Sequence, residues 1–98
     1  MMAGLWDRWT NRETGEILET CTLLTTRANP LIEPIHERMP VIVPREMMNL
    51  WLDPTLSLPD DFFAPYPPEL MEHFPVSSVV NHAGYDGPEC RLRQALLL

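Results

Sequence analysis

Lysine is absent from this sequence. All of its basic residues are arginines, and their 7 positive charges are outnumbered by 14 acidic residues, which leaves a net charge of −7. Because proteins bind nucleic acid along an extended surface through clustered Lys and Arg, this balance argues against such a surface here. We therefore expect any phosphate contact to be local and to depend on arginine.

Long apolar runs are also missing. No stretch of about 18 apolar residues could span a membrane as a helix, and the first residues lack the basic and apolar regions of a signal peptide. We therefore expect no membrane association and a cytoplasmic location.

Cysteine is scarce, and its spacing predicts neither a metal site nor a redox motif. The two cysteines, Cys21 and Cys90, lie far apart, so ordinary reduced thiols are the favoured interpretation. His73 and His82 have no ligand spacing to Cys90, and we expect no metal and no cofactor. With 98 residues and 11 prolines, the chain fits at most one modest domain of short elements and many turns.

The first 26 residues predict a β-hairpin. Residues 1–10 and 17–26 carry bulky and β-branched side chains typical of strands, and the polar segment 11–16 joins them. Within this turn, Gly15 supplies the positive φ that hairpins require.

The segment 25–44 holds a single histidine between apolar stretches. Asn29 precedes Pro30, a pairing that favours a capped helix start, and Pro40 ends any helix. We predict one or two helical turns with His36 and Arg38 near their C-terminal end.

The rest of the chain reads as short elements. Strands are predicted at 41–43 and 74–81, helices at 44–53 and 68–73, and a proline-rich loop at 60–68, while 91–98 is left unassigned.

Four stretches, in this order, carry a resemblance to a known family. They are Ala3-Gly4-Leu5-Trp6-Asp7-Arg8-Trp9; Thr25-Thr26-Arg27-Ala28-Asn29 with Ile35-His36-Glu37-Arg38-Met39-Pro40-Val41-Ile42; Trp51-Leu52-Asp53; and Pro75-Val76-Ser77 through Val80-Asn81 to Asp86-Gly87-Pro88. Together they resemble the C-terminal half of the SOS response-associated peptidase (SRAP) family. The resemblance implies an α+β fold with a mixed, barrel-like β-sheet and short peripheral helices, of which residues 1–98 form an incomplete SRAP-type domain.

The resemblance also implies a chemistry. Members act in the DNA damage response on single-stranded DNA with abasic sites: an N-terminal cysteine attacks the sugar aldehyde, and the resulting Schiff base closes to a thiazolidine crosslink. In some members the same cysteine cleaves the protein's own propeptide. This chain begins Met-Met-Ala-Gly where the family begins Met-Cys-Gly-Arg, so the half with the nucleophile is absent and we expect the chain alone to be inactive.

Individual roles follow by matching positions. His36 matches the catalytic histidine, Asp7 falls where many members have a catalytic glutamate, and Arg38 matches a contact to DNA phosphate. Trp6 or Trp9 matches an aromatic that stacks on bases. If this is right, Asp7 and His36 should face a common cleft.

Plainer interpretations stay open for each position. His36 suits a helix end, Asp7 a solvated strand, Arg38 a surface ion pair with a neighbouring glutamate, and the tryptophans a core. The alternative function is a non-catalytic remnant that binds a partner, self-associates or pairs with a missing N-terminal half.

Overall fold

The chain forms a small α+β structure, described by a computed structural model over residues 1–94. Its strands pair as two separate two-stranded sheets. The strands are β1 (Gly4–Thr10), β2 (Ile17–Leu23), β3 (Thr25–Arg27) and β4 (Arg38–Pro40). The helices are the 3-10 turn η1 (Arg45–Met47), α1 (Met48–Leu52), and the 3-10 turns η2 (Pro68–Leu70), η3 (Ser78–Asn81) and η4 (Pro88–Arg91).

The predicted hairpin is confirmed. Strands β1 and β2 pair antiparallel from Gly4 opposite Leu23 to Thr10 opposite Ile17. Gly15 has a φ of 75°, which side chains with a Cβ rarely adopt, and its N–H donates to the Asn11 carbonyl over 2.7 Å. The turn chemistry therefore decides the register of the whole hairpin.

Three strand segments meet at one point, which we call the three-strand junction. The Ala3 N–H donates to the Val41 carbonyl (2.8 Å), the Val41 N–H to the Leu24 carbonyl (2.9 Å), and the Leu24 N–H to the Ala3 carbonyl (2.9 Å). The start of the chain then runs beside the segment after β4, since the Val43 N–H donates to the Met1 carbonyl over 2.8 Å. The hairpin β1–β2 and the pair β3–β4 leave this junction as separate sheets.

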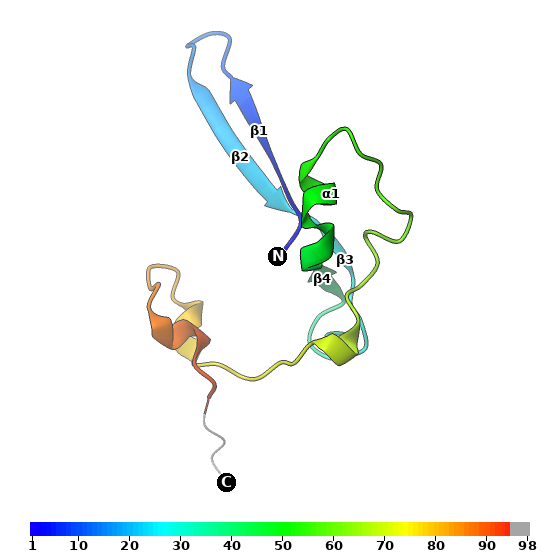
Figure 1. The fold of residues 1–98 in the computed structure, drawn as a ribbon. Coiled ribbons are helices and arrows are strands. Elements are labelled where there is room, and N and C mark those ends of the chain that lie inside the picture. The colour runs from blue at the N-terminus through cyan, green and yellow to red at the C-terminus, as the bar shows by residue number, and fades with distance from the viewer. Residues whose placement is uncertain (95–98) are drawn as a thin grey trace.

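The expected barrel-like sheet is wrong for the described residues. No strand of residues 1–94 pairs with more than one other named strand, so the two sheets do not join into a closed ring. Instead, the hairpin extends away from the junction as a free ribbon (Figure 1). The physical reason is that each of the four strands is paired along one edge only, whereas every strand of a closed barrel is paired along both edges.

The core is small and lies at the junction. Its buried apolar residues are Ala3, Val41, Val43 and Phe62, and Leu24, Met47, Met48, Trp51 and Leu58 pack against them. Val41 is the largest side chain that is fully buried. The predicted helix at 44–53 is confirmed as η1 and α1, which place Met47 and Trp51 on this core.

Two predicted strands are wrong. Strand β4 covers Arg38–Pro40 rather than 41–43, so Arg38 lies on a strand and not in a helical turn. Residues 74–81 hold the turn η3, because the Ser77 hydroxyl accepts from the Val79 N–H (3.3 Å) and caps it. Only Val76 keeps a strand-like contact, an isolated bridge to Arg93.

The chain has an open shape. Its radius of gyration is 17.8 Å, whereas a compact chain of this length has about 13 Å. Figure 1 shows the hairpin, the loop after α1 and the C-terminal turns spread around the junction. None of the helices in residues 1–94 is long and apolar enough to cross a membrane. The cytoplasmic location stays a prediction.

Candidate functional site

His36 ends a tight turn that begins at Asn29. The Asn29 side-chain Oδ1 accepts from the N–H groups of Leu31 and Ile32, both at 3.1 Å, so the predicted cap is confirmed. The Ile32 carbonyl then accepts from the N–H groups of Ile35 (2.8 Å) and His36 (3.0 Å). The turn is a single one, the shorter of the two lengths predicted, because β4 begins two residues after His36.

The imidazole of His36 is oriented by the backbone of Arg38. Its Nδ1 accepts from the Arg38 N–H over 2.9 Å and lies 3.1 Å from the Arg38 carbonyl oxygen. A neutral ring that accepts through Nδ1 carries its proton on Nε2, whereas a protonated ring can donate from Nδ1 to the carbonyl. The Arg38 backbone therefore occupies Nδ1, and no hydrogen bond within residues 1–94 uses Nε2.

Arg38 extends across the β3–β4 pair. Its Nη2 donates to the Thr25 carbonyl (2.8 Å) and hydroxyl (3.0 Å), and its Nε lies 3.3 Å from the same hydroxyl. Neither of the two salt bridges in residues 1–94 includes Arg38, so the ion pair with a neighbouring glutamate is not formed there. The contacts with Thr25 use Nε and Nη2. The two hydrogens on Nη1, of the five that a guanidinium group can donate, take no part in these contacts and can donate to another group.

Asp7 lies in the middle of the exposed hairpin, opposite Thr20. Its Oδ1 accepts from the Arg8 N–H over 2.7 Å. The side chain lines a shallow cavity of about 330 Å³ together with Leu5, Trp6, Thr20, Cys21 and Thr22.

Trp6 and Trp9 are both on the surface. Their exposed fractions are 69% for Trp6 and 57% for Trp9, so neither belongs to the core of the described residues. Because side chains alternate along a strand, the two rings point to opposite faces of the hairpin. Either ring could stack on a base, but a single groove could use only one.

The structure does not bring Asp7 and His36 into one cavity. The cavity beside Asp7 lies on the β1–β2 hairpin, while His36 precedes β4, and no hydrogen bond in residues 1–94 joins them. The two sheets leave the three-strand junction separately, which explains the separation. Of the candidate residues, His36 and Arg38 are joined by hydrogen bonds, and Trp6 and Asp7 line one cavity on the hairpin.

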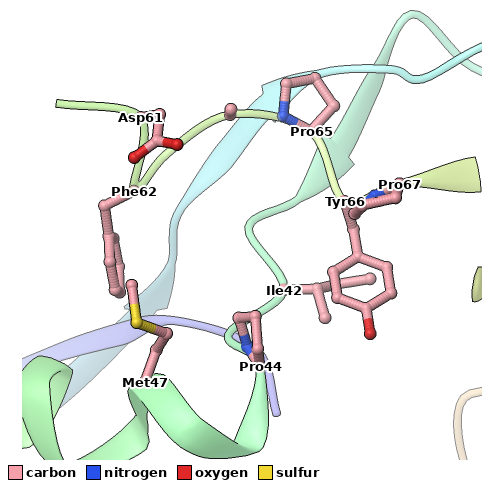
Figure 2. Close-up of a pocket in the computed structure, with 9 residues that line it drawn as sticks. Ile42, Pro44, Met47, Asp61, Phe62, Pro65, Tyr66 and Pro67 are labelled. Carbon is pink, nitrogen blue, oxygen red and sulfur yellow. The ribbon is translucent and has the colours of Figure 1, made fainter. Parts of the chain in front are cut away.

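Two apolar cavities were not foreseen from the sequence. One, of about 240 Å³, lies between the loop 61–67 and the segment 42–47, and Figure 2 shows Tyr66 and Pro67 on the side of Ile42. The other, of about 190 Å³, is lined by Arg38 with apolar neighbours such as Met39 and Met71. For the cavity of about 240 Å³, the aromatic residues of the proline-rich loop were the signal that the sequence offered.

Comparison with known proteins places this arrangement in a family. Residues 1–83 match the family described as SOS response associated peptidase (SRAP). The chain is 43% identical over 90 residues to the abasic site processing protein YoqW of Bacillus subtilis, which covers 89% of this chain and 40% of YoqW. It is 36% identical over 91 residues to the abasic site processing protein HMCES of Xenopus tropicalis, covering 91% of this chain and 27% of HMCES.

A solved structure agrees. A crystal structure of a protein from Bacteroides thetaiotaomicron superimposes with a TM-score of 0.81 at 30% identity, covering 96% of this chain and 43% of that one. The chain belongs to the SRAP family. It spans about 40% of the length of YoqW.

Proposed function

We propose that this chain is the C-terminal part of a single SRAP domain that processes abasic sites in single-stranded DNA. A segment with an N-terminal cysteine would supply the nucleophile, and the product would be a covalent DNA–protein crosslink. The proposal is supported by the family membership, by relatives named abasic site processing proteins, and by the His-Glu-Arg-Met-Pro motif at residues 36–40.

The observation that carries the proposal is the large surface left uncovered. The chain exposes 8513 Å², whereas a compact protein of its mass, 11.3 kDa, exposes about 5,700 Å². The excess of about 2,800 Å² exceeds the roughly 800 Å² that each partner buries in a typical stable protein interface. It includes apolar side chains of the hairpin, among them Leu5, Trp6, Trp9, Leu18 and Leu23. A second polypeptide segment packed on the hairpin would cover this surface.

The proposed roles are those that the resemblance to the SRAP family implies. His36 exchanges protons through Nε2 while the abasic sugar opens and the Schiff base forms. Arg38, next to it, holds a DNA phosphate through its remaining guanidinium donors. One of Trp6 and Trp9 stacks on a base, and Asp7 assists as the acid.

Asp7 can act with His36 only in the completed domain. Within residues 1–94, no further strand pairs with the hairpin that carries Asp7 along its outer edges. A segment packed on the hairpin could hold it against the His36 turn, because an isolated two-stranded hairpin is only marginally stable and depends on what packs against it.

The test is complementation. The 98-residue chain is mixed with an N-terminal segment of a family member that begins with cysteine, and crosslinking to an abasic single-stranded oligonucleotide is followed on a denaturing gel. We expect no crosslink from either part alone and a crosslink from the mixture. His36→Ala should slow the reaction by about 10²–10⁴-fold, as for loss of a general acid or base.

His82→Ala is the matched control, because His82 is an exposed histidine outside the motif, and it should leave the rate unchanged. A crosslink formed by the chain alone would refute the proposal, as would a mixture that reacts equally well with His36→Ala.

Self-association is the second candidate, and the uncovered hairpin favours it. Two copies could pair through the exposed face of β1–β2 without any DNA chemistry. Light scattering on the chain alone distinguishes the two. A stable dimer that Trp6→Arg dissociates, together with failed complementation, would support self-association.

A further inference from the structure

We propose that Asn29 is the positioning residue of this site: by bridging the His36 turn to the carbonyl of Tyr66, it holds the His36 ring with Nδ1 on the Arg38 backbone and Nε2 free. The catalytic meaning of this orientation rests on the proposed function. The orientation itself can be measured without DNA.

Asn29 differs from the other polar residues by its burial. Its exposed fraction is 3%, and it is the only polar or charged residue of the described chain that is buried. A buried amide is costly unless its donors and acceptors are satisfied. Here no buried side-chain nitrogen or oxygen in residues 1–94 lacks a partner.

The side chain contacts two separate segments. Its Oδ1 accepts from the N–H groups of Leu31 and Ile32 within the turn. Its Nδ2 donates to the Tyr66 carbonyl over 2.7 Å and lies 3.3 Å from the Met71 sulfur. The amide therefore ties the turn to a loop that follows it by more than thirty residues in the sequence.

The hydrogen bonds that start at Asn29 reach His36 through one further residue, Ile32. The Ile32 N–H is shared between the Asn29 side-chain Oδ1 (3.1 Å) and the Asn29 backbone carbonyl (3.0 Å), and Ile32 offers its own carbonyl to the N–H groups of Ile35 and His36. The side chains after Ile32 have little packing, since Ile35 is 64% exposed. Hydrogen bonds rather than side-chain packing therefore position the His36 ring: those from the Asn29 amide to the turn, the bond from the Ala28 N–H to the Glu37 carbonyl (2.9 Å), and the bond from the Arg38 N–H to Nδ1.

The Tyr66 carbonyl, which accepts from the Asn29 side chain, lies in the proline-rich loop that lines the cavity of about 240 Å³. Figure 2 shows Tyr66 between Pro65 and Pro67, with its ring near Ile42. Proline on both sides restricts the backbone around the Tyr66 carbonyl. The same loop carries Phe62, which is buried in the core. An acceptor with so little freedom can hold the turn in one position.

Asn11 provides an internal comparison. Its Oδ1 accepts from the N–H groups of Glu13 (2.9 Å) and Thr14 (3.4 Å), the same pattern that Asn29 makes in its turn. Its side-chain bonds in the described residues stay within its own turn, and no second segment is bridged. Capping alone therefore does not explain the burial of Asn29, and the bridge to Tyr66 does.

The experiment uses nitrogen-15-labelled histidine in the full chain. The ring nitrogen shifts of His36 are recorded at a pH where the ring is neutral, for the native chain and for Asn29→Ala, Asn29→Ser and Asn11→Ala. We expect native His36 to hold the proton on Nε2 almost entirely. In Asn29→Ala, its Nδ1 and Nε2 shifts should move to the averaged values of the chain in urea.

Asn29→Ser separates the two contacts, since serine caps a turn but is too short to reach Tyr66. We expect it to fold and still to lose most of the native tautomer preference at His36. Asn11→Ala should leave the His36 shifts unchanged. Shifts of His73 and His82 report on the rest of the chain in every variant.

Two results would overturn the proposal. One is a native-like His36 spectrum in Asn29→Ser, and the other is an equal change in Asn11→Ala. If Asn29→Ala unfolds, Asn29→Ser decides. A His36 response to Asn29→Ser without any crosslinking in the complementation assay would refute the proposed function and leave the positioning role standing.

Discussion

Phe62 is the single side chain whose removal should cost this chain the most. It is 8% exposed, stacks on Trp51 with ring centroids 5.4 Å apart and an angle of 15°, and meets the edge of Phe63 at 5.2 Å. Replacing a buried phenylalanine by alanine typically costs about 3–5 kcal/mol. The free energy of unfolding of a domain is about 5–15 kcal/mol, and a chain with so few buried residues belongs at the low end of this range. Phe62→Ala should therefore remove half or more of the stability.

Phe63→Ala is the matched control in the same cluster. Phe63 is 44% exposed and makes two edge contacts, to Trp51 at 6.1 Å and to Phe62 at 5.2 Å. Half the burial of a phenylalanine contributes about 1 kcal/mol, and each edge contact adds about 0.5 kcal/mol at a partly exposed site. The expected loss is about 2 kcal/mol, roughly half that of Phe62→Ala.

Urea unfolding at 25 °C, followed by circular dichroism, measures both losses. The midpoint should fall further for Phe62→Ala than for Phe63→Ala, with the slope of the free energy against urea unchanged. Equal losses for the two variants, or a loss below about 1 kcal/mol for Phe62→Ala, would show that the aromatic cluster does not anchor the loop as the structure indicates.

Three smaller predictions concern the surface. Gly15→Ala should destabilise the hairpin by about 1–2 kcal/mol, measured by amide exchange in β1 and β2, because its φ is 75°. The hydroxyl and backbone N–H of Thr55 lower the pKa of Asp53 below 3.8, so this contact stabilises the fold above pH 3.8 and is lost as the pH falls through the lower folded value. Thr55→Val should raise the Asp53 pKa in a carbon-13 titration. The exposed Arg8–Glu19 salt bridge, 2.7 Å long, should contribute about 0.2–1 kcal/mol in a double-mutant cycle and nothing in about 1 M salt.

Local features were predictable from the sequence. The β1–β2 hairpin follows from bulky and β-branched side chains on both sides of the polar turn at Gly15, and the Asn29 cap follows from an asparagine before proline. The helix at 44–53 follows from Pro44 and the spacing of Met47, Leu50 and Trp51. Each depends on neighbours in the sequence, which is why a pattern can reveal it.

Long-range features were not predictable in this way. The strand-forming run Val41-Ile42-Val43 enters the three-strand junction instead of extending β4, because its partners are Ala3 and Leu24. Residues 74–81 have strand-like composition, but within residues 1–94 they pair only through one bridge, so the Ser77 cap prevails.

The same distinction between local and long-range features applies to the candidate site. The link between His36 and Arg38 is local and lies within the motif that carried the resemblance. The bridge from Asn29 to Tyr66 spans two segments without any sequence signal, and only the folded chain shows it. The shared cleft of Asp7 and His36 stays a prediction, since it depends on how the hairpin packs in a completed domain.

The three-strand junction sets the order in which a growing chain can acquire structure. Strands β1 and β2 lie close together in the sequence and can pair within microseconds, long before a ribosome has added the next residues. The ring of bonds among Ala3, Leu24 and Val41 has to wait for the last of the three to leave the exit tunnel. Until then the nascent hairpin lacks its bonds to Val41, and translation speed between Leu24 and Val41 sets how long its paired strands go without this support.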